Sequence, residues 1–190
     1  MPYNYAQLSS SITTEVIILG GGISGSLAAY YLVNNGIDCV VLDGRTIGLG
    51  STCASTSLLQ YEIDTPLHRL VHLVGYQNAV RAHQLCLEAI YILEAIAFKI
   101  GFKDFQQKQS LYYAARKKDE LWLREEYLIR KQNELRVTWL NEDDLKELYD
   151  INAPAAILSK DAAQTNAYLF THALLQYAIK KGARVLIHAV

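Results

Sequence analysis

Residues 14–43 read TEVIILGGGISGSLAAYYLVNNGIDCVVLD, and this stretch decides the fold because it specifies both a local structure and a ligand. Three of its glycines, Gly20, Gly22 and Gly25, stand in G-x-G-x-x-G spacing. An apolar run at residues 16–19 precedes them and a helical pattern follows. This order predicts a strand, a tight turn and a helix. The glycines permit the turn, let the backbone approach a pyrophosphate and let helix and strand pack closely.

The start of the predicted helix suits an anion. From Ile23 and Ser24 onward, the free N–H groups of the first turn and the positive end of the helix dipole would face the phosphates of a ligand. Residues 3–43 contain no Lys or Arg, so this stabilisation needs no basic side chain. The alternative interpretation is a Gly-rich turn of an ordinary α/β protein.

A second strand is predicted at residues 39–42, after a helix stop at residues 34–36. The strand leads into Asp43, whose carboxylate can accept hydrogen bonds from both hydroxyls of an adenosine ribose. An acid at this position also repels a 2′-phosphate, which argues against NADP. Strand, helix, second strand and acid together predict a dinucleotide-binding unit.

The composition is that of an ordinary globular protein, and 190 residues suffice for one substantial core, or for one domain and part of another. A net charge of −1 gives no electrostatic support for nucleic-acid binding. The three cysteines, Cys39, Cys53 and Cys86, lack metal-type spacing and favour a reduced, cytoplasmic location. Residues 1–15 lack the basic start of a signal peptide, and no stretch reaches the length of a transmembrane segment.

Residues 44–57, GRTIGLGSTCASTS, follow the acid directly and are rich in small and hydroxyl side chains. We expect a flexible loop near the cofactor phosphates, where backbone N–H groups and hydroxyls can hydrogen-bond. The alternative is a solvent-exposed loop without a ligand. The hydroxyls concerned belong to Ser51, Thr52, Ser55, Thr56 and Ser57.

Three segments together resemble the FAD-dependent oxidoreductases of the D-amino-acid oxidase superfamily, which includes glycine and sarcosine oxidases and glycerol-3-phosphate dehydrogenases. They are EVIILGGGISGSLAAYYL, the acid with its following Gly44-Arg45, and GLGSTCASTSLLQ. The resemblance implies FAD as cofactor and an α/β fold with a Rossmann-like FAD-binding βαβ unit and an inserted α+β substrate-side segment. It also implies a small-molecule amine or hydroxy substrate that gives a hydride to the flavin.

The same resemblance implies roles for individual residues. The glycine motif would bind the pyrophosphate, and Asp43 would bind the adenosine ribose. Arg45 would lie by the adenine, and the hydroxyl-rich loop would run toward the ribityl chain and flavin. Many relatives carry Asn-x-Gly near the end of that loop, where this chain has Ser55-Thr56-Ser57. The implied cofactor-binding residues are Gly20, Gly22, Ile23, Ser24, Gly25, Asp43, Gly44, Arg45, Gly50, Ser51, Thr52, Ser55, Thr56 and Ser57; no catalytic residue is assigned.

The resemblance further implies a division of the chain. Residues 1–65 would form the first part of the FAD-binding domain, residues 66–164 the substrate-side segment, and residues 165–190 a helix and strand that return to the FAD-binding domain. The returning strand, predicted at 184–190, would run parallel to the first strand and lie beside it. Because the resembled enzymes are longer, we expect a truncated fold that lacks its C-terminal half and is inactive alone.

Residues 66–100 are predicted to be mostly helical. His68 and His72 are four residues apart, as in some metal sites, but a third ligand at a helpful spacing is missing, so no metal is expected. His83 is expected at the surface or with its hydrogen bonds satisfied.

A charged helix is predicted at residues 117–135, with a leucine stripe at positions 121, 128 and 135. Its solvated face is expected to carry Arg124, Glu125, Glu126, Arg130 and Lys131. Short strands are predicted at 109–115, 137–139 and 155–158.

Gln60, Glu62 and Asp64 fall on one side if their segment is extended. A carboxylate there could steer an amine substrate, or the segment could be a solvated strand edge. Two other function classes stay open: a non-catalytic module that holds FAD or NAD, and an NAD-dependent dehydrogenase, which the hydroxyl-rich loop disfavours.

Overall fold

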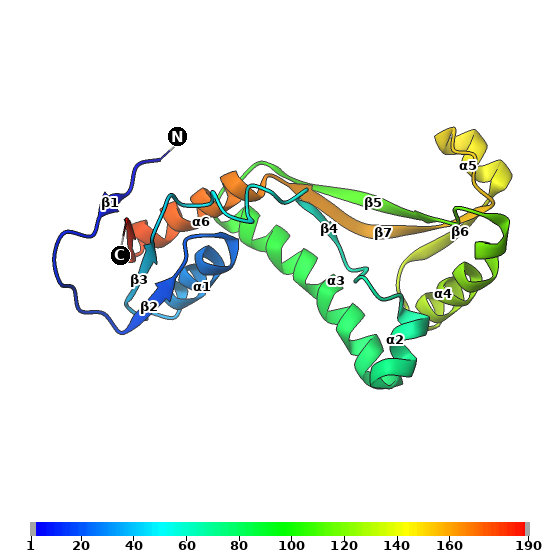
Figure 1. The fold of residues 1–190 in the computed structure, drawn as a ribbon, viewed down its shortest axis with the longest axis horizontal. Coiled ribbons are helices and arrows are strands. Elements are labelled where there is room, and N and C mark those ends of the chain that lie inside the picture. Colours follow the sequence, from blue (N-terminus) through cyan, green and yellow to red (C-terminus); the bar gives the residue numbers. More distant parts are fainter. Residues whose placement is uncertain (1–2, 189–190) are drawn as a thin grey trace. The chain divides into compact units, whose positions relative to one another are not determined.

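The computed structural model describes residues 3–188 and divides into two compact units (Figure 1). The first unit comprises Met1–Ser57, Ile96–Phe105 and Thr165–Val190. The second unit comprises Leu58–Ala95 and Gln106–Gln164. None of the helices within residues 3–188 is long and apolar enough to cross a membrane.

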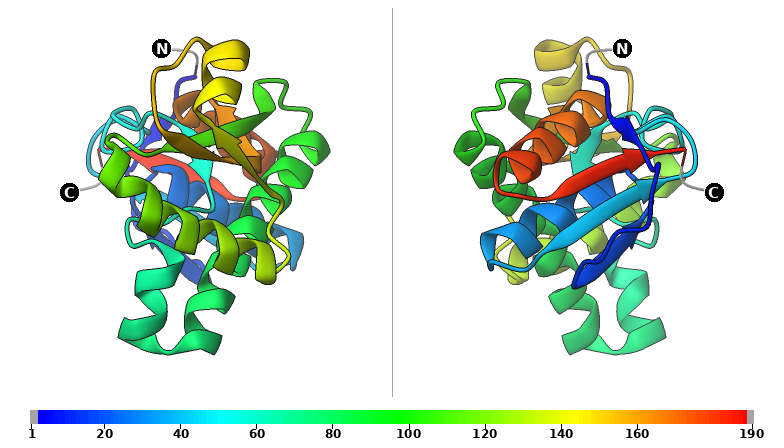
Figure 2. Two further views of the ribbon diagram at one scale, coloured as in Figure 1. Left: turned by 90° about the vertical axis from the view of Figure 1, so that its right-hand side faces the viewer. Right: turned by 90° about the vertical axis from the view of Figure 1, so that its left-hand side faces the viewer.

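The first unit contains a four-stranded parallel sheet with the order β1-β8-β3-β2. The right-hand view of Figure 2 shows these strands side by side. The strand at 16–19 and the helix start at residue 23 are as predicted from the sequence. The elements are β1 (Ala6–Gln7), β2 (Val16–Leu19), α1 (Ile23–Asn34), β3 (Cys39–Asp43), α6 (Ala167–Lys180) and β8 (Arg184–Ile187).

The returning strand β8 is parallel, as predicted, but the prediction that it lies beside β2 was wrong. It pairs with β3, where Val41 lies opposite Val185, while β2 pairs with the other side of β3. With β8 in this position, α1 and α6 pack against each other and share one core. The strand ends at Ile187, and residues 189–190 of the predicted strand lie outside the described residues.

The core of the first unit lies between the sheet and the two helices. Alternate residues of β3, Cys39 and Val41, point into it and are fully buried, because successive side chains of a strand point to opposite faces. Leu175 and Ala178 of α6 cover them. In the edge strand β2, the side chain of Leu19 points away from this core and is 82% exposed.

The second unit is built on a sheet with the order β4-β7-β5, in which β6 also pairs with β7. The strands β4 and β6 run antiparallel to β7. Its strands β5 and β7 are longer than the predicted segments. The elements are β4 (Leu58–Gln60), α2 (Leu67–Val74), α3 (Tyr76–Lys99), β5 (Phe105–Tyr113), a 3₁₀ turn η1 (Lys117–Asp119), α4 (Glu120–Gln132), β6 (Val137–Asn141), α5 (Glu142–Tyr149) and β7 (Ala155–Thr165).

The helical stretch predicted at 66–100 is two helices, because Gly75 has a positive φ of 83° between α2 and α3. The predicted faces of α4 were partly wrong: Arg124, Glu125 and Lys131 are exposed as predicted, but other residues are not where the sequence predicted them. Leu121 and Leu128 are 76% and 54% exposed, whereas Glu126 and Arg130 are buried. Leucines seven residues apart do share a face, but the face that packs into the core carries Leu123 and Tyr127, which cluster with Ala155 and Ile157 of β7.

We predict that Leu175→Ala lowers the free energy of unfolding by about 2–5 kcal/mol, because it opens a cavity in the core of the first unit. Leu19→Ala is the matched control, since the same atoms are removed from an exposed position, and it should change that free energy by less than about 0.5 kcal/mol. Urea unfolding measures both. Equal losses for the two variants would contradict this assignment of the core.

Candidate functional site

The junction of β2 and α1 forms a turn that requires two of its glycines. Gly20 has a φ of +104°, a conformation that residues with a side chain rarely adopt, and its N–H donates to the carbonyl oxygen of Leu42 at 2.8 Å. A Cβ on Gly25 would lie 2.0 Å from the carbonyl oxygen of Gly20. The helix can therefore start directly behind the strand only while residue 25 lacks a side chain.

The N-terminus of α1 has no capping side chain at its N-cap position. Its N-cap, Gly22, has extended backbone and no side chain that could cap the helix. A Cβ on Gly22 would have Thr52 Oγ1 as its nearest neighbour, at 3.0 Å. The same hydroxyl accepts a hydrogen bond from the N–H of Ile23 at 3.1 Å. The helix tip thus faces a hydroxyl of the loop that the sequence predicted to lie near phosphates.

Asp43 connects the end of β3 to this turn. Its Oδ2 accepts a hydrogen bond from the N–H of Gly21 at 2.8 Å, and its Oδ1 accepts one from the N–H of Arg45 at 2.9 Å. Carboxylate oxygens have two lone pairs each, so both can still accept hydrogen bonds from the hydroxyls of a ligand. The acid and the glycine motif, far apart in sequence, therefore form one site.

The hydroxyl-rich loop divides into two parts. Thr52 is buried and reaches the helix tip, as described, and Ser51 and Thr56 are exposed. Ser57 has a positive φ of 56°, and its Oγ accepts a hydrogen bond from the N–H of Ala167 at the start of α6. The Oγ of Ser55 accepts a hydrogen bond from the N–H of Ser57. The first part of the loop therefore lies at the glycine motif, and its end is attached to α6.

Three further predicted residues, Gly44, Arg45 and Gly50, belong to the segment that follows Asp43. Gly44 and Arg45 follow the acid and are exposed. The guanidinium of Arg45 reaches the middle of the loop, where a Cβ on Gly50 would be 3.6 Å from its Nη2. The N–H donors at the start of α1 and the carboxylate acceptors of Asp43 therefore lie beside each other.

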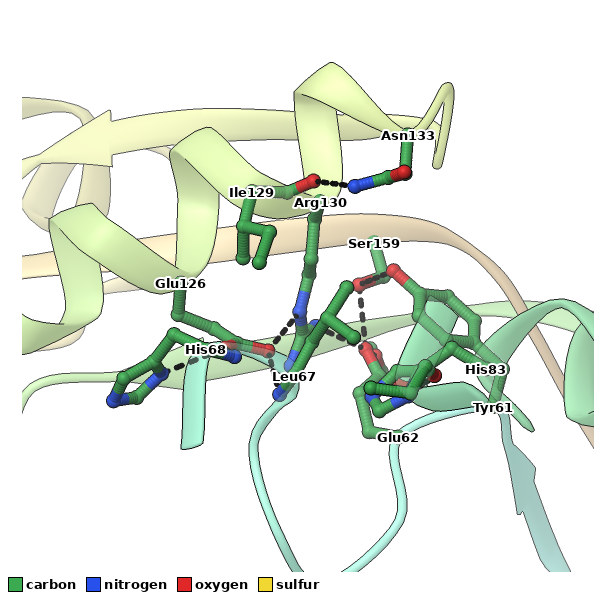
Figure 3. Close-up of polar contacts among 12 residues, drawn as sticks. Tyr61, Glu62, Leu67, His68, His83, Glu126, Ile129, Arg130, Asn133 and Ser159 are labelled. Atoms are coloured by element: carbon green, nitrogen blue, oxygen red, sulfur yellow. Dashed lines mark hydrogen bonds and ion pairs between the residues drawn. The ribbon is translucent and has the colours of Figure 1, made fainter. Parts of the chain in front are cut away.

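Sequence reasoning missed a cluster of buried charges in the second unit (Figure 3). Glu126 of α4 accepts hydrogen bonds from the backbone N–H groups of Leu67 and His68, at 3.0 and 2.8 Å. These N–H groups belong to the first turn of α2, so Glu126 supplies the negative charge that a helix N-terminus favours. The His68 ring also lies against this carboxylate, with Nδ1 2.8 Å from Oε2.

Arg130 completes the cluster one turn further along α4. Its Nε donates to Glu126 at 2.6 Å and its Nη1 to Glu62 at 3.0 Å. Burial would raise the pKa of Glu126, but the charge of Arg130 and the hydrogen bonds from His68 and Arg130 outweigh it and hold that pKa below its ordinary value. Glu126 and Arg130 are therefore a buried ion pair.

The sequence predicts Glu126 and Arg130 on the solvated face of α4 because both are charged residue types. The sequence did contain a signal for the ion pair, because a Glu and an Arg four residues apart lie on the same helix face. Here that face also carries Leu123 and Tyr127, and it is the buried one. What the sequence of α4 alone could not indicate was the partner, since Glu62 lies far away in sequence.

His83, expected at the surface or satisfied, is completely buried. Its Nδ1 is 3.3 Å from the carbonyl oxygen of Ala79, and within the described residues its Nε2 has no hydrogen-bond partner. Burial, and then the charge of Arg130, lower the pKa of this imidazole. Within residues 3–188, no three His, Cys, Asp or Glu side chains gather as metal ligands.

Comparison with known proteins gives a family match. Residues 15–190 match the model of the family described as FAD dependent oxidoreductase. A Bacillus subtilis (strain 168) protein with the provisional name Rieske 2Fe-2S iron-sulfur protein YhfW is 23% identical over 185 residues, which are 96% of this chain and 35% of that protein.

Two solved structures share the fold. Glycine oxidase from Geobacillus kaustophilus is similar with a TM-score of 0.76 and 18% identity, over 92% of this chain and 46% of that one. L-alpha-glycerophosphate oxidase from Mycoplasma pneumoniae, solved with FAD bound, has a TM-score of 0.75 and 15% identity, over 94% of this chain and 45% of that one. The chain thus spans less than half the length of the proteins it matches.

We predict that Gly25→Ala destabilises the first unit by several kcal/mol, because its Cβ would lie 2.0 Å from the backbone oxygen of Gly20. Gly50→Ala is the matched control, since its Cβ would have no neighbour closer than 3.6 Å and Gly50 has no positive φ. Thermal and urea unfolding test the pair. A Gly25→Ala protein as stable as Gly50→Ala would refute the close strand-to-helix junction.

We predict that Glu126→Gln lowers the free energy of unfolding by about 3 kcal/mol at neutral pH, because it leaves Arg130 without its closest charge partner. A carboxylate whose pKa is lowered by folding stabilises the protein above its unfolded pKa, and this stabilisation is lost as the pH falls through the folded pKa. The difference between wild type and variant should therefore shrink below a pH of about 4.

The neighbouring exposed acid provides the control for that experiment. Glu125→Gln should change the stability by less than about 0.5 kcal/mol at every pH. If the two glutamine variants have the same stability at neutral pH, the buried ion pair does not exist in solution.

Proposed function

The chain belongs to the family of FAD-dependent oxidoreductases, and from this premise we propose that its first unit binds FAD at the junction of β2 and α1. FAD is the cofactor of this family. The observation that carries the proposal is the hydrogen bond between Asp43 and the N–H of Gly21, because it holds a ribose acceptor beside a bare helix tip. The fit is supported by Gly22, whose missing side chain leaves room at that tip.

The pyrophosphate would bind at the start of α1. There the N–H groups of Gly22, Ile23, Ser24 and Gly25 and the helix dipole favour negative charge. The Thr52 hydroxyl already accepts a hydrogen bond from the N–H of Ile23. A phosphate oxygen could accept from the same N–H, and the Thr52 hydroxyl could also donate its own hydrogen to that oxygen.

Asp43 would accept hydrogen bonds from the adenosine ribose, with Gly44 and Arg45 beside the adenine. The loop residues Gly50, Ser51, Thr52, Ser55, Thr56 and Ser57 would extend toward the ribityl chain and flavin. Since the Ser57 hydroxyl already accepts from Ala167, its contribution would be to hold the loop end rather than to bind FAD strongly.

For the whole protein we propose oxidation of a small-molecule amine or hydroxy substrate. Bound FAD supplies the acceptor for the substrate's hydride, and the protein contributes binding and orientation. The names glycine oxidase and glycerophosphate oxidase of two structural neighbours support this substrate range. The first unit would be the FAD-binding domain and the second unit the substrate side. Free Cys39, Cys53 and Cys86 support a reduced, cytoplasmic location.

We predict that Asp43→Asn weakens FAD binding by about tenfold or more, because a charged acceptor beside the motif is lost. The matched control is Asp38→Asn, at the other end of β3, where the carboxylate pairs with Arg184 instead. Its FAD affinity should equal that of the wild type. Titration of the chain with FAD, followed by quenching of flavin fluorescence, measures both dissociation constants.

Two results would count against the proposal. Equal FAD affinities of the two aspartate variants would remove Asp43 from the site. A colourless protein that binds NAD but not FAD would favour a dehydrogenase. In the whole protein, bleaching of the bound flavin by an amine in the absence of oxygen would exclude a non-catalytic module.

A further inference from the structure

The N-terminal segment adds a part to the first unit that the family match does not cover. The match begins at residue 15, whereas β1 at residues 6–7 pairs in parallel with β8, where Gln7 lies opposite Ile187 (Figure 2). Residues 3–5, directly before β1, line a cavity of about 180 Å³. The family match therefore assigns no role to this segment or to the cavity wall that it forms.

The cavity lies next to the proposed ribose acceptor. Asp43, at the end of β3, is opposite Ile187 of β8, and Ile187 lines the cavity. Thr46 and Ile47, three and four residues after Asp43, line it as well. Neighbouring strands of a sheet are only about 4.8 Å apart, so a group attached to a sugar at Asp43 can reach this cavity.

The wall that the N-terminal segment forms is aromatic and fixed to α6. The ring of His172, on α6, stacks with the rings of Tyr3 and Tyr5, and the centroids are 5.3 and 5.7 Å apart. The Tyr5 hydroxyl also lies within hydrogen-bond distance of Nδ1 of this imidazole, at 2.7 Å. Two stacked rings and one hydrogen bond therefore hold the segment beside the cavity.

The wall suits an uncharged, flat group. Among the described residues that line the cavity, none is Asp, Glu, Lys or Arg. Burial lowers the pKa of His172, which keeps this imidazole neutral at neutral pH. Aromatic rings favour another flat ring against them, and the Asn4 amide and the Thr46 hydroxyl offer hydrogen bonds to polar atoms at the edge of such a ring.

The volume of the cavity selects one part of a larger ligand. Pockets for whole small-molecule ligands measure roughly 300–1,000 Å³, so about 180 Å³ suits a single ring system. Adenine is uncharged, flat and polar at its edge, and in FAD it is attached to the ribose that Asp43 is proposed to bind. Resting on the proposed function, we propose that residues 3–5 complete the FAD site by enclosing the adenine ring in this cavity.

The test is a titration of the 190-residue chain with FAD after replacement of Tyr3, which is 40% exposed and outside the core. Tyr3→Ala is expected to weaken FAD binding by about fivefold or more, because the stacking of a base on an aromatic side chain is lost. Tyr3→Phe keeps the ring and should bind like the wild type. The matched control is Tyr31→Ala, an exposed tyrosine of α1 outside the cavity, which should also bind like the wild type.

ADP separates the adenine from the flavin. Because ADP carries the adenosine diphosphate of FAD alone, Tyr3→Ala should weaken ADP binding by the same factor, measured by competition with FAD. In the wild type, bound ADP should also shift the side-chain methyl NMR signals of Ile187, since a base ring would lie beside them. This second readout does not depend on the stability of a variant.

The inference is overturned if Tyr3→Ala binds FAD as tightly as Tyr31→Ala, or if bound ADP leaves the Ile187 methyl signals unchanged. A loss of affinity for FAD but not for ADP would also overturn it, because Tyr3 would then not contact the adenine. The cofactor proposal survives each of these results while Asp43→Asn weakens FAD binding. A wild-type chain that binds neither FAD nor ADP would overturn both proposals.

Discussion

The first unit depends on the backbone turn between β2 and α1. This turn leaves no room for a side chain at residue 25, and the carboxylate of Asp43 holds it in place. Gly25 lies so close to Gly20 that strand and helix pack directly against each other. Asp43 then accepts the N–H of Gly21, which fixes the end of β3 beside the turn. One short segment thus provides both the packing of the sheet and the place where we propose that a diphosphate and a sugar bind together.

The second unit depends on a different constraint, a buried ion pair in which each charge needs an opposite charge and hydrogen bonds. Glu126 serves two partners, because it neutralises Arg130 and also accepts the first N–H groups of α2. Arg130 in turn reaches Glu62 beside β4. The pair therefore connects α4, α2 and the segment after β4 within this unit, and it leaves Glu62 at the wall of a cavity. Such a pair is costly to break, since each partner would remain as an unpaired buried charge.

The difference between the two units explains what the sequence could predict. The glycine motif predicted β2, α1, β3 and the acid, because each glycine role depends on neighbours within a few residues. The Asn141 cap of α5 is equally local, since its side chain accepts the N–H of Asp144 three residues later. The burial of Glu126, Arg130 and His83 was not predicted, because each depends on side chains that only the folded chain brings near. The neighbour of β8 likewise depends on where two helices pack, not on the strand's own letters.

The central claim is that the bare tip of α1 receives the pyrophosphate of FAD. The most direct measurement is amide hydrogen exchange at Gly22, Ile23 and Ser24, followed residue by residue with and without saturating FAD. The account predicts that FAD slows exchange at these amides, because phosphate oxygens accept their N–H groups. If FAD binds and protects other amides while exchange at these three is unchanged, the pyrophosphate lies elsewhere and the account is wrong.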